Sequence, residues 1–308
     1  MHPNLTPVLE IGGTHLTAAL VDTTSWSVVD GTTTRSHLQS GGTADELIEA
    51  IVRGAQTLDP DHGTEWAVAI PGPFDYERGI GLFENVGKFD SLRGFDVRSA
   101  LTEGIRPRPS FVHFLNDADA FGVGEFAGGA ARGAARAVCI TLGTGIGSAY
   151  LVHGEPTNDG PGVPPEGSAH LIQYKGRPLE ETVSRRAILA GYATAVGGAE
   201  DAAIDVREIA ELAREGRPPA SQILNGAFSA LGVALAGSLH EFGATRLVIG
   251  GSMARSWDIV EPAIRLGLSS VFAEFDSLEI CQAQRPDDAP LVGAAFWAAR
   301  HHRPATVG

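Results

Sequence analysis

Cysteine is scarce in this sequence. Its 308 residues include only Cys139 and Cys281, which lie far apart in apolar segments typical of strands. Two such residues supply neither a disulfide framework nor a cysteine-rich zinc site. We therefore expect no structural zinc site, and we expect a cytoplasmic protein because thiols stay reduced in that compartment.

Positive charge is also in short supply. The formal net charge is −14, and no run of Lys and Arg offers a local exception. A protein with this much net negative charge repels the phosphate backbone of a nucleic acid. We expect no nucleic-acid partner.

Long hydrophobic runs are missing as well. The most apolar segment, 226–239, is too short to span a bilayer and contains Gly and Ser, so it is predicted to be a buried helix. Residues 1–7 show no basic region followed by an apolar stretch, which disfavours a secretory signal. We expect no membrane partner.

The chain does have enough length for two lobes, because a single core rarely grows beyond about 250–300 residues. Segments 8–11 and 16–21 are predicted to form a hairpin around a glycine turn. Residues 10–21 lie without gaps over residues 141–152, and strand, turn and strand match in order. Such a repeat indicates two similar α/β lobes facing one another across a cleft.

Glycine-rich turns follow three predicted strands, at residues 12–14, 143–147 and 250–251. Glycine has no Cβ, so its backbone can take positive φ and approach an anion, and the hydroxyls of Thr14 and Thr144 add donors. We predict that these turns bind phosphates, although glycine can also serve a turn alone. Neither a Walker A pattern nor a Rossmann fingerprint is present, because 143–147 leads into a strand.

Asn116 and Asp117 stand where the predicted strand 112–115 ends and a helix begins. Open α/β folds place their chemistry at this edge of the sheet. A carboxylate there can accept a proton from a substrate hydroxyl while a neighbouring amide fixes that hydroxyl. The alternative is that Asp117 only caps the helix and Asn116 only shapes the turn.

The remaining pattern alternates between strands and helices. It predicts strands over 66–70, 246–249 and 278–282, and helices over 43–58, 179–196, 206–214, 220–242, 257–272 and 290–300.

In this order the motifs resemble the ROK family of sugar kinases and related repressors, within the actin/hexokinase superfamily. The resemblance spans nearly the whole chain and rests on 10–14, 70–75, Asn85, 115–120, 141–147 and 248–251. It implies an α/β fold of two actin/hexokinase-like (ribonuclease-H-like) lobes around a central cleft. The smaller lobe would be 1–117, completed by the C-terminal helix 290–308, and the larger lobe 118–289.

The resemblance also implies a role for each matched residue. Asp117 would be the general base, and Glu10 would hold Mg²⁺ through water. The sugar would be bound by Gly72, Asn85, Asn116, Asp117, His170 and Glu180. ATP would be bound by Gly12, Gly13, Thr14, Gly143, Thr144, Gly145, Gly250 and Gly251.

The sequence departs from the family pattern at three places. Glu10 replaces the usual Asp, and the alternative interpretation is a strand-edge residue without a metal role. Many members carry Glu-x-Gly-His where this chain reads Glu166-Gly-Ser-Ala-His170, so Gly167 stands where the Glu should be. The zinc-binding cysteine segment is missing, and 176–180 takes its place, so Glu180 is either a sugar ligand or a solvated first-turn Glu.

The resemblance implies an ATP-dependent hexose kinase, glucokinase-like, that phosphorylates a sugar hydroxyl. Fructokinase, mannokinase and N-acetylhexosamine kinase activities stay open, as does polyphosphate as the donor. A sugar-binding pseudokinase is a second class. A repressor is disfavoured because only nine residues precede Glu10, too few for a helix-turn-helix. Family resemblance alone predicts a homodimer.

Overall fold

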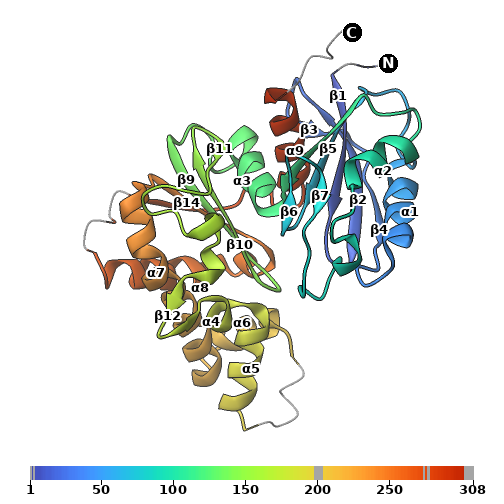
Figure 1. The fold of residues 1–308 in the computed structure, drawn as a ribbon. Helices are drawn as coiled ribbons and strands as arrows, with labels where there is room; N and C mark the ends of the chain where they lie inside the picture. The colour runs from blue at the N-terminus through green and yellow to red at the C-terminus, as the bar shows by residue number, and fades with distance from the viewer. Residues whose placement is uncertain (1, 3, 198–203, 273–274, 276–277, 302–308) are drawn as a thin grey trace. The chain divides into compact units, whose positions relative to one another are not determined.

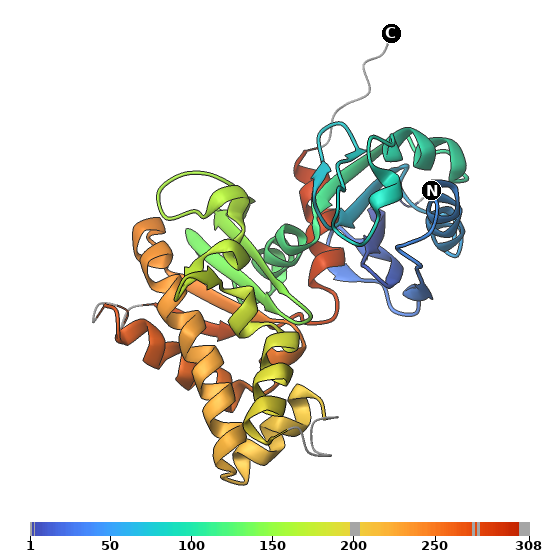
Figure 2. The same ribbon diagram turned by 60° about the horizontal axis from the view of Figure 1, so that its bottom comes forward.

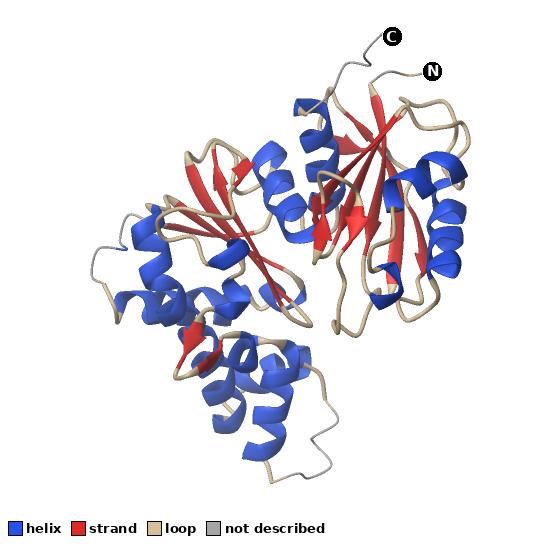
Figure 3. Cartoon of the chain, viewed as in Figure 1, coloured by secondary structure: helices blue, strands red, loops and turns tan. Residues whose placement is uncertain are grey.

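The computed structural model describes residues 2, 4–197, 204–272, 275 and 278–301. They form two compact units. The first unit comprises Met1–Gly128 and Asp287–Gly308, and the second comprises Gly129–Pro286. Each unit is a mixed sheet packed against helices (Figure 3), which confirms the predicted α/β class.

The sheet of the first unit has the strand order β3-β2-β1-β5-β8, and β4 also pairs with β2. β1 and β2 are antiparallel, whereas β1, β5 and β8 run parallel. The carboxyl ends of β1, β5 and β8 therefore lie at one edge of the sheet. The strands are β1 (Leu5–Ile11), β2 (His15–Asp22), β3 (Ser27–Val28), β4 (Thr34–His37), β5 (Glu65–Ile70) and β8 (Phe111–Asn116).

Helices cover both faces of this sheet (Figure 1). On one face, α1 (Ala44–Ala55) and α2 (Val97–Gly104) bury apolar side chains against the strands. On the other, α9 (Ala289–Arg300) contacts β1, β5 and β8. The N-terminus of α1 is fixed by a capping box between Thr43 and Glu46. A short hairpin, β6 (Phe74–Asp75) and β7 (Ile80–Gly81), and η1 (Asp90–Leu92) complete the unit.

The helix that follows Asp117, α3 (Asp117–Gly128), packs against α9 with almost no space between the backbones. A Cβ added to Gly124 would come within 1.9 Å of the Ala289 carbonyl oxygen. One added to Gly293 would come within 1.8 Å of the Ala120 carbonyl oxygen. Glycine at both positions lets the helices touch, so α3 belongs to the first unit and the chain divides after Gly128, not at residue 118.

Gly293→Ala should destabilise the first unit. The new methyl group must push α3 and α9 apart, and overpacking of this kind costs about 1–3 kcal/mol. Gly226→Ala is the matched control, because Gly226 is an exposed helical glycine with nothing within 4 Å of an added Cβ. It should be neutral or stabilise by about 0.5–1 kcal/mol. Thermal unfolding followed by circular dichroism separates the two results, and an unchanged Tm for Gly293→Ala would contradict the packing argument.

The second unit repeats the strand order of the first, as β11-β10-β9-β14-β15. β9 and β10 are antiparallel, and β9, β14 and β15 run parallel. The strands are β9 (Arg136–Leu142), β10 (Ile146–Val152), β11 (Glu155–Pro156), β14 (Arg246–Gly250) and β15 (Glu279–Gln282). The long helix α7 (Pro218–Phe242) and α8 (Trp257–Ser269) pack side by side (Figure 2) and share a core with β9 and β14.

The hairpin repeat is present, but it is not free of gaps. Ile11 pairs with Leu16 across the first turn, whereas Leu142 pairs with Ile146 across the second. The first turn therefore has one residue more than the second. The gapless overlay of 10–21 on 141–152 is wrong beyond the turn, because its few identities could not show the strand register.

The helix predicted over 179–196 is broken into α4 (Glu180–Val183) and α5 (Arg185–Ala195). Ser184 has extended backbone (φ −63°, ψ 156°), and its hydroxyl caps α5 by accepting a hydrogen bond from the Ala187 N–H at 3.3 Å. A small polar residue that competes for backbone bonds explains the break. The unit also contains α6 (Val206–Arg214), η2 (Pro165–Gly167), η3 (Ala169–Leu171), η5 (Ser252–Arg255), β12 (Gln173–Tyr174) and β13 (Arg177–Pro178).

Among the described residues, α7 alone is long and apolar enough to cross a membrane by length and composition. Half of its most apolar window is buried within the protein. Its inward residues, such as Leu224, Leu231 and Leu235, are fully buried in the core of the second unit. α7 is therefore the core helix that the sequence predicts over 220–242.

Candidate active site

The candidate residues of the first unit gather at the carboxyl edge of its sheet. Ile70 pairs with Asn116 at the ends of β5 and β8, and Glu10 pairs with Ala69 near the ends of β1 and β5. The parallel register therefore places Glu10, the turn containing Gly72, and Asn116 on neighbouring strand ends. Asp117 follows directly as the first residue of α3.

Asn116, not Asp117, supplies the cap of α3. Its Oδ1 accepts hydrogen bonds from the N–H groups of Ala118 at 2.9 Å and Asp119 at 3.3 Å. The Asp117 carboxylate accepts a hydrogen bond from the Ala118 N–H at 2.9 Å. Because the neighbouring amide caps the helix, the Asp117 carboxylate is not needed for that purpose.

Tyr76 holds the amide of Asn116 in place, and it lies outside every sequence motif. Asn116 Nδ2 donates to the Tyr76 hydroxyl at 2.9 Å, and that hydroxyl donates to the Ile70 carbonyl at 3.3 Å. A Cβ on Gly72 would lie 3.2 Å from the same hydroxyl, so glycine there makes room for Tyr76. Burial raises the pKa of Tyr76 far above its ordinary value, which keeps the phenol neutral.

Three carboxyl groups share this edge. Burial raises the pKa of Asp117, and the nearby Lys88 ammonium is the largest opposing influence. Burial and then the charge of Asp117 raise the pKa of Glu10, and the same two causes raise that of Asp119 to about 7. A carboxylate with a raised pKa is a stronger base, as proton abstraction from a hydroxyl requires.

The first glycine turn is held by its own backbone. Gly12 N–H donates to the His15 carbonyl at 2.8 Å, and the Thr14 carbonyl accepts from Leu38 N–H at 2.9 Å. The Thr14 hydroxyl lies 2.7 Å from His15 Nδ1. Neither Gly12 nor Gly13 has positive φ, so the conformational reason given for these glycines is wrong. Their contribution is the lack of a side chain, which leaves the turn uncovered.

Asn85 lies on an exposed part of the loop that joins β7 to η1. Its φ of 57° is in the left-handed region, which Asn adopts more readily than most residues. The conformation agrees with the ordinary turn role, and its contact with sugar stays a prediction.

In the second unit, Glu180 lies against the second glycine turn. Its Oε2 accepts a hydrogen bond from the Ile146 N–H at 3.1 Å. A Cβ on Gly145 would come within 2.5 Å of the same oxygen, so glycine is required for the contact. Gly143, whose carbonyl accepts from Arg185 N–H at 3.0 Å, ties the turn to the start of α5. Glu180 is therefore more than a solvated first-turn residue, whereas Glu181 is exposed as predicted.

Neither Gly143 nor Gly145 has positive φ. The prediction that the second turn needs glycine for a positive φ is therefore wrong, as it is for the first turn. An added Cβ on Gly143 would meet nothing within 4 Å. Gly143 is partly exposed and Thr144, which follows, is exposed, so the backbone at both residues is open to a ligand of this unit.

The loop carrying His170 is attached to the strand that leaves this turn. The Ser148 hydroxyl, on β10, donates to the Gly167 carbonyl and accepts from Ala169 N–H at 2.8 Å. His170 lies in η3 and is partly buried. Gly167 has φ +67°, and an added Cβ would lie 2.9 Å from Asn158 Oδ1. The family's Glu would therefore be strained at this position, while Glu166 is exposed with φ 56°.

Gly250 and Gly251 close β14 at its carboxyl end. Gly251 has φ +82°, and a Cβ there would lie 2.3 Å from the Leu142 carbonyl oxygen. Close packing on β9 is sufficient to explain this glycine. The predicted contact with adenosine stays a prediction.

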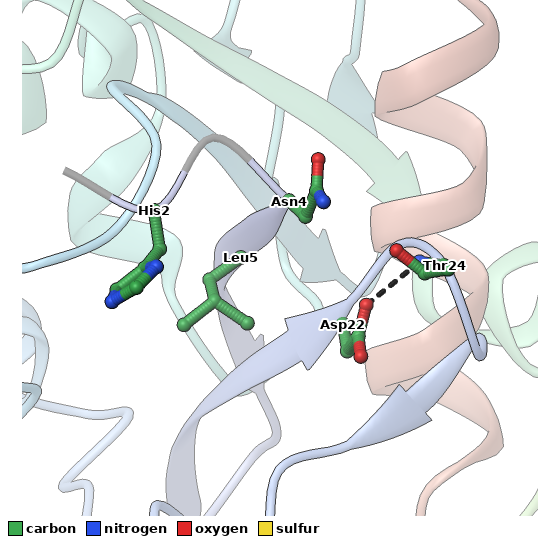
Figure 4. Close-up of a pocket in the computed structure, with 5 residues that line it drawn as sticks. All are labelled: His2, Asn4, Leu5, Asp22 and Thr24. Carbon is green, nitrogen blue, oxygen red and sulfur yellow. Dashed lines mark hydrogen bonds between the residues drawn. The ribbon is translucent and has the colours of Figure 1, made fainter.

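A surface pocket lies elsewhere in the first unit (Figure 4). It is lined by His2, Asn4, Leu5, Asp22 and Thr24, at the start of β1 and the end of β2. This edge is opposite to the one that carries the Gly12 turn. None of the candidate residues lines it.

A family model describing the ROK family matches residues 7–301. The chain belongs to the ROK family. A glucokinase of Thermotoga maritima is 26% identical over 311 residues, covering 93% of this chain and 95% of that protein. The family match and the glucokinase relatives show that the protein is a ROK sugar kinase, a phosphotransferase with a hydroxyl acceptor.

Solved structures share its fold. A ROK family glucokinase from Streptomyces griseus, in complex with glucose and AMPPNP, has a TM-score of 0.75 and 25% identity over 96% of this chain and 99% of that one. A ROK hexokinase from Thermus thermophilus has a TM-score of 0.76 and 24% identity, with the same coverage. These similarities confirm the actin/hexokinase-like fold expected of a ROK protein.

Of the two cysteines of this ROK kinase, Cys139 is buried and Cys281 is partly exposed. In the described part of the chain, no cluster of three or more His, Cys, Asp or Glu side chains could hold a metal ion. The absence of a structural zinc site remains a prediction.

Proposed function

We propose that this protein is an ATP-dependent, glucokinase-like hexose kinase that transfers the γ-phosphoryl group to the C6 hydroxyl of a sugar. The observation that carries the proposal is the edge of the first sheet, where a carboxylate with a raised pKa, Asp117, follows an amide, Asn116, that Tyr76 fixes in place. The named glucokinase relatives support glucose as the acceptor.

The reaction assigns each group a part. Asp117 accepts the proton of the sugar hydroxyl as that oxygen bonds to phosphorus and the bond to ADP breaks. Asn116, Gly72 and Asn85 from the first unit, and His170 and Glu180 from the second, would contact the sugar. The turns at Gly12–Thr14 and Gly143–Gly145 would hold phosphates, and Gly250–Gly251 the adenosine.

Glu10, near the end of β1, and Asp117, the first residue of α3, fit Mg²⁺ bound through water. Glu10 and Asp117 are close enough for the Asp117 charge to raise the pKa of Glu10, and such paired carboxylates suit a hydrated Mg²⁺. Glu10 would hold the ion, and the ion would supply positive charge to neutralise the phosphates. We also propose a cytoplasmic homodimer without nucleic-acid or membrane partners.

A coupled ADP-release assay over glucose, mannose, fructose, N-acetylglucosamine and N-acetylmannosamine tests the proposal. ATP and polyphosphate are compared as donors. Sugar-dependent ADP release, fastest with glucose, is expected. If the protein binds sugar but releases no ADP with any of the five sugars, a pseudokinase is favoured instead.

The pH dependence of kcat should show an acid limb. Asp117 works as a base only when it is deprotonated, and burial disfavours its charged form, so activity is lost as pH falls through the raised pKa. We expect the midpoint to lie above 3.8, the ordinary value. Burial and then the charge of Asp117 raise the pKa of Asp119 to about 7, so Asp119→Asn is measured alongside to show which group sets the acid limb. A rate that stays constant down to pH 4 would remove Asp117 from the role.

A further inference from the structure

The loop before η1 holds Lys88 in a defined position. Phe89, which follows it, is fully buried, has φ 60° and packs against Phe83 with ring centroids 5.3 Å apart. The Asp90 carboxylate accepts hydrogen bonds from the N–H groups of Val86 at 3.1 Å and Gly87 at 3.3 Å. A bulky residue whose backbone is held in the left-handed region persists there only where the surrounding structure fixes it. The loop is therefore built to present Lys88.

The stem of Lys88 passes the first glycine turn. A Cβ added to Gly13 would lie 3.6 Å from Lys88 Cδ, and Lys88 is partly buried. Among the side chains that influence Asp117, the ammonium of Lys88 is the one whose charge favours the carboxylate. One flexible cationic side chain is therefore close to both the turn and the proposed base.

Negative charge gathers at this edge of the sheet, and a nearby cation would offset it. Three carboxyl groups, Glu10, Asp117 and Asp119, gather where the nucleotide triphosphate would bring further negative charge. The Arg35 charge acts on Glu10, and the Lys88 charge acts on Asp117. Lysine is rare in this chain, with Lys88 and Lys175 the two among 23 Lys and Arg residues. A lysine ammonium binds phosphate as a compact charge with three donors.

We propose that Lys88 is a further catalytic residue, whose ammonium group binds the γ-phosphoryl group of ATP at the Gly12–Thr14 turn. The inference rests on the proposed kinase function. As the sugar oxygen bonds to phosphorus and ADP departs, charge on the three equatorial phosphoryl oxygens is stabilised by the ammonium, while Asp117 takes the hydroxyl proton. Lys88 itself neither gains nor loses a proton.

The test compares Lys88→Met and Lys88→Arg with wild type. Removing one such charge contact should lower kcat by about 10²–10³-fold. Lys88→Arg should recover part of the loss, and the sugar KM should change little. In equilibrium binding, Lys88→Met should weaken a non-hydrolysable ATP analogue by at least about tenfold and leave ADP affinity unchanged, because only the former carries a γ-phosphate. Lys175→Met is the matched control, since Lys175 lies on an exposed turn of the second unit.

Several results would overturn the inference. If wild type is active and Lys88→Met keeps most of its kcat, Lys88 does not contact the transferring group. If the deficit disappears at high pH, Lys88 acts only by favouring the Asp117 carboxylate. If wild type releases no ADP with any sugar, the kinase function fails, yet the analogue and ADP affinities still decide whether Lys88 recognises a γ-phosphate. Lys88→Gln, which keeps much of the stem beside Gly13, replaces Lys88→Met if circular dichroism shows misfolding.

Discussion

Asp117→Asn is expected to lower kcat by at least about 10²-fold, the usual scale for the loss of a positioned base. An amide has nearly the same shape, and its oxygen can still accept the hydrogen bond that Ala118 N–H now donates at 2.9 Å. The cap of α3 comes from Asn116, so the helix should form as before. The fold and the affinity for sugar should therefore remain close to wild type while turnover is lost.

Asp119→Asn is the matched control for this substitution. Asp119 is a second carboxyl group at the start of α3, and its pKa is also raised by burial. We expect it to change kcat far less, because no predicted role in proton transfer falls on it. Steady-state ADP release, with sugar binding measured separately, distinguishes the variants. Retention of most of the kcat by Asp117→Asn would remove Asp117 from the role of base.

Local patterns account for what the sequence predicted well. The hairpins around Gly12 and Gly143 follow from two apolar segments separated by a glycine turn, and both are present. Asn116 and Asp117 fall where a buried strand meets a helix, which a short window of sequence reveals. The parallel register of β5 and β8 then brings Asn116 beside the end of β5 without any further signal.

Contacts between distant segments account for what could not be predicted. Tyr76 meets Asn116 across 40 residues of chain, and Glu180 meets Ile146 across 34. No period or spacing records such a pair, because each depends on how separate elements pack. The glycines show the same limit. Gly293 must lack a side chain because α3 packs against it, and Gly145 must lack one because the Glu180 carboxylate lies beside it. Neither reason is visible in the sequence.

Glu180→Gln is expected to raise the KM for sugar by about 10- to 100-fold, and the KM for ATP much less. A charge-assisted hydrogen bond to a sugar hydroxyl contributes roughly 1.5–3 kcal/mol, and each 1.4 kcal/mol is about tenfold in affinity. The amide oxygen of Gln can still accept from Ile146 N–H, which Glu180 now does at 3.1 Å. The glycine turn should therefore keep its conformation, so the effect of the lost charge falls on the sugar.

Glu166→Gln should have a small effect, although Glu166 is the carboxylate nearest in sequence to the family's sugar-binding Glu. Glu166 is exposed, and the next position, Gly167, has a left-handed φ and Asn158 beside it, which disfavours a side chain there. Recognition would then rest on His170 and Glu180, and Glu181→Gln serves as the exposed-neighbour control. KM values for glucose and ATP decide between the two carboxylates. If Glu166→Gln is the more damaging variant, the loop rearranges when sugar binds so that Glu166 takes the family position, and the register inferred for 166–170 is wrong.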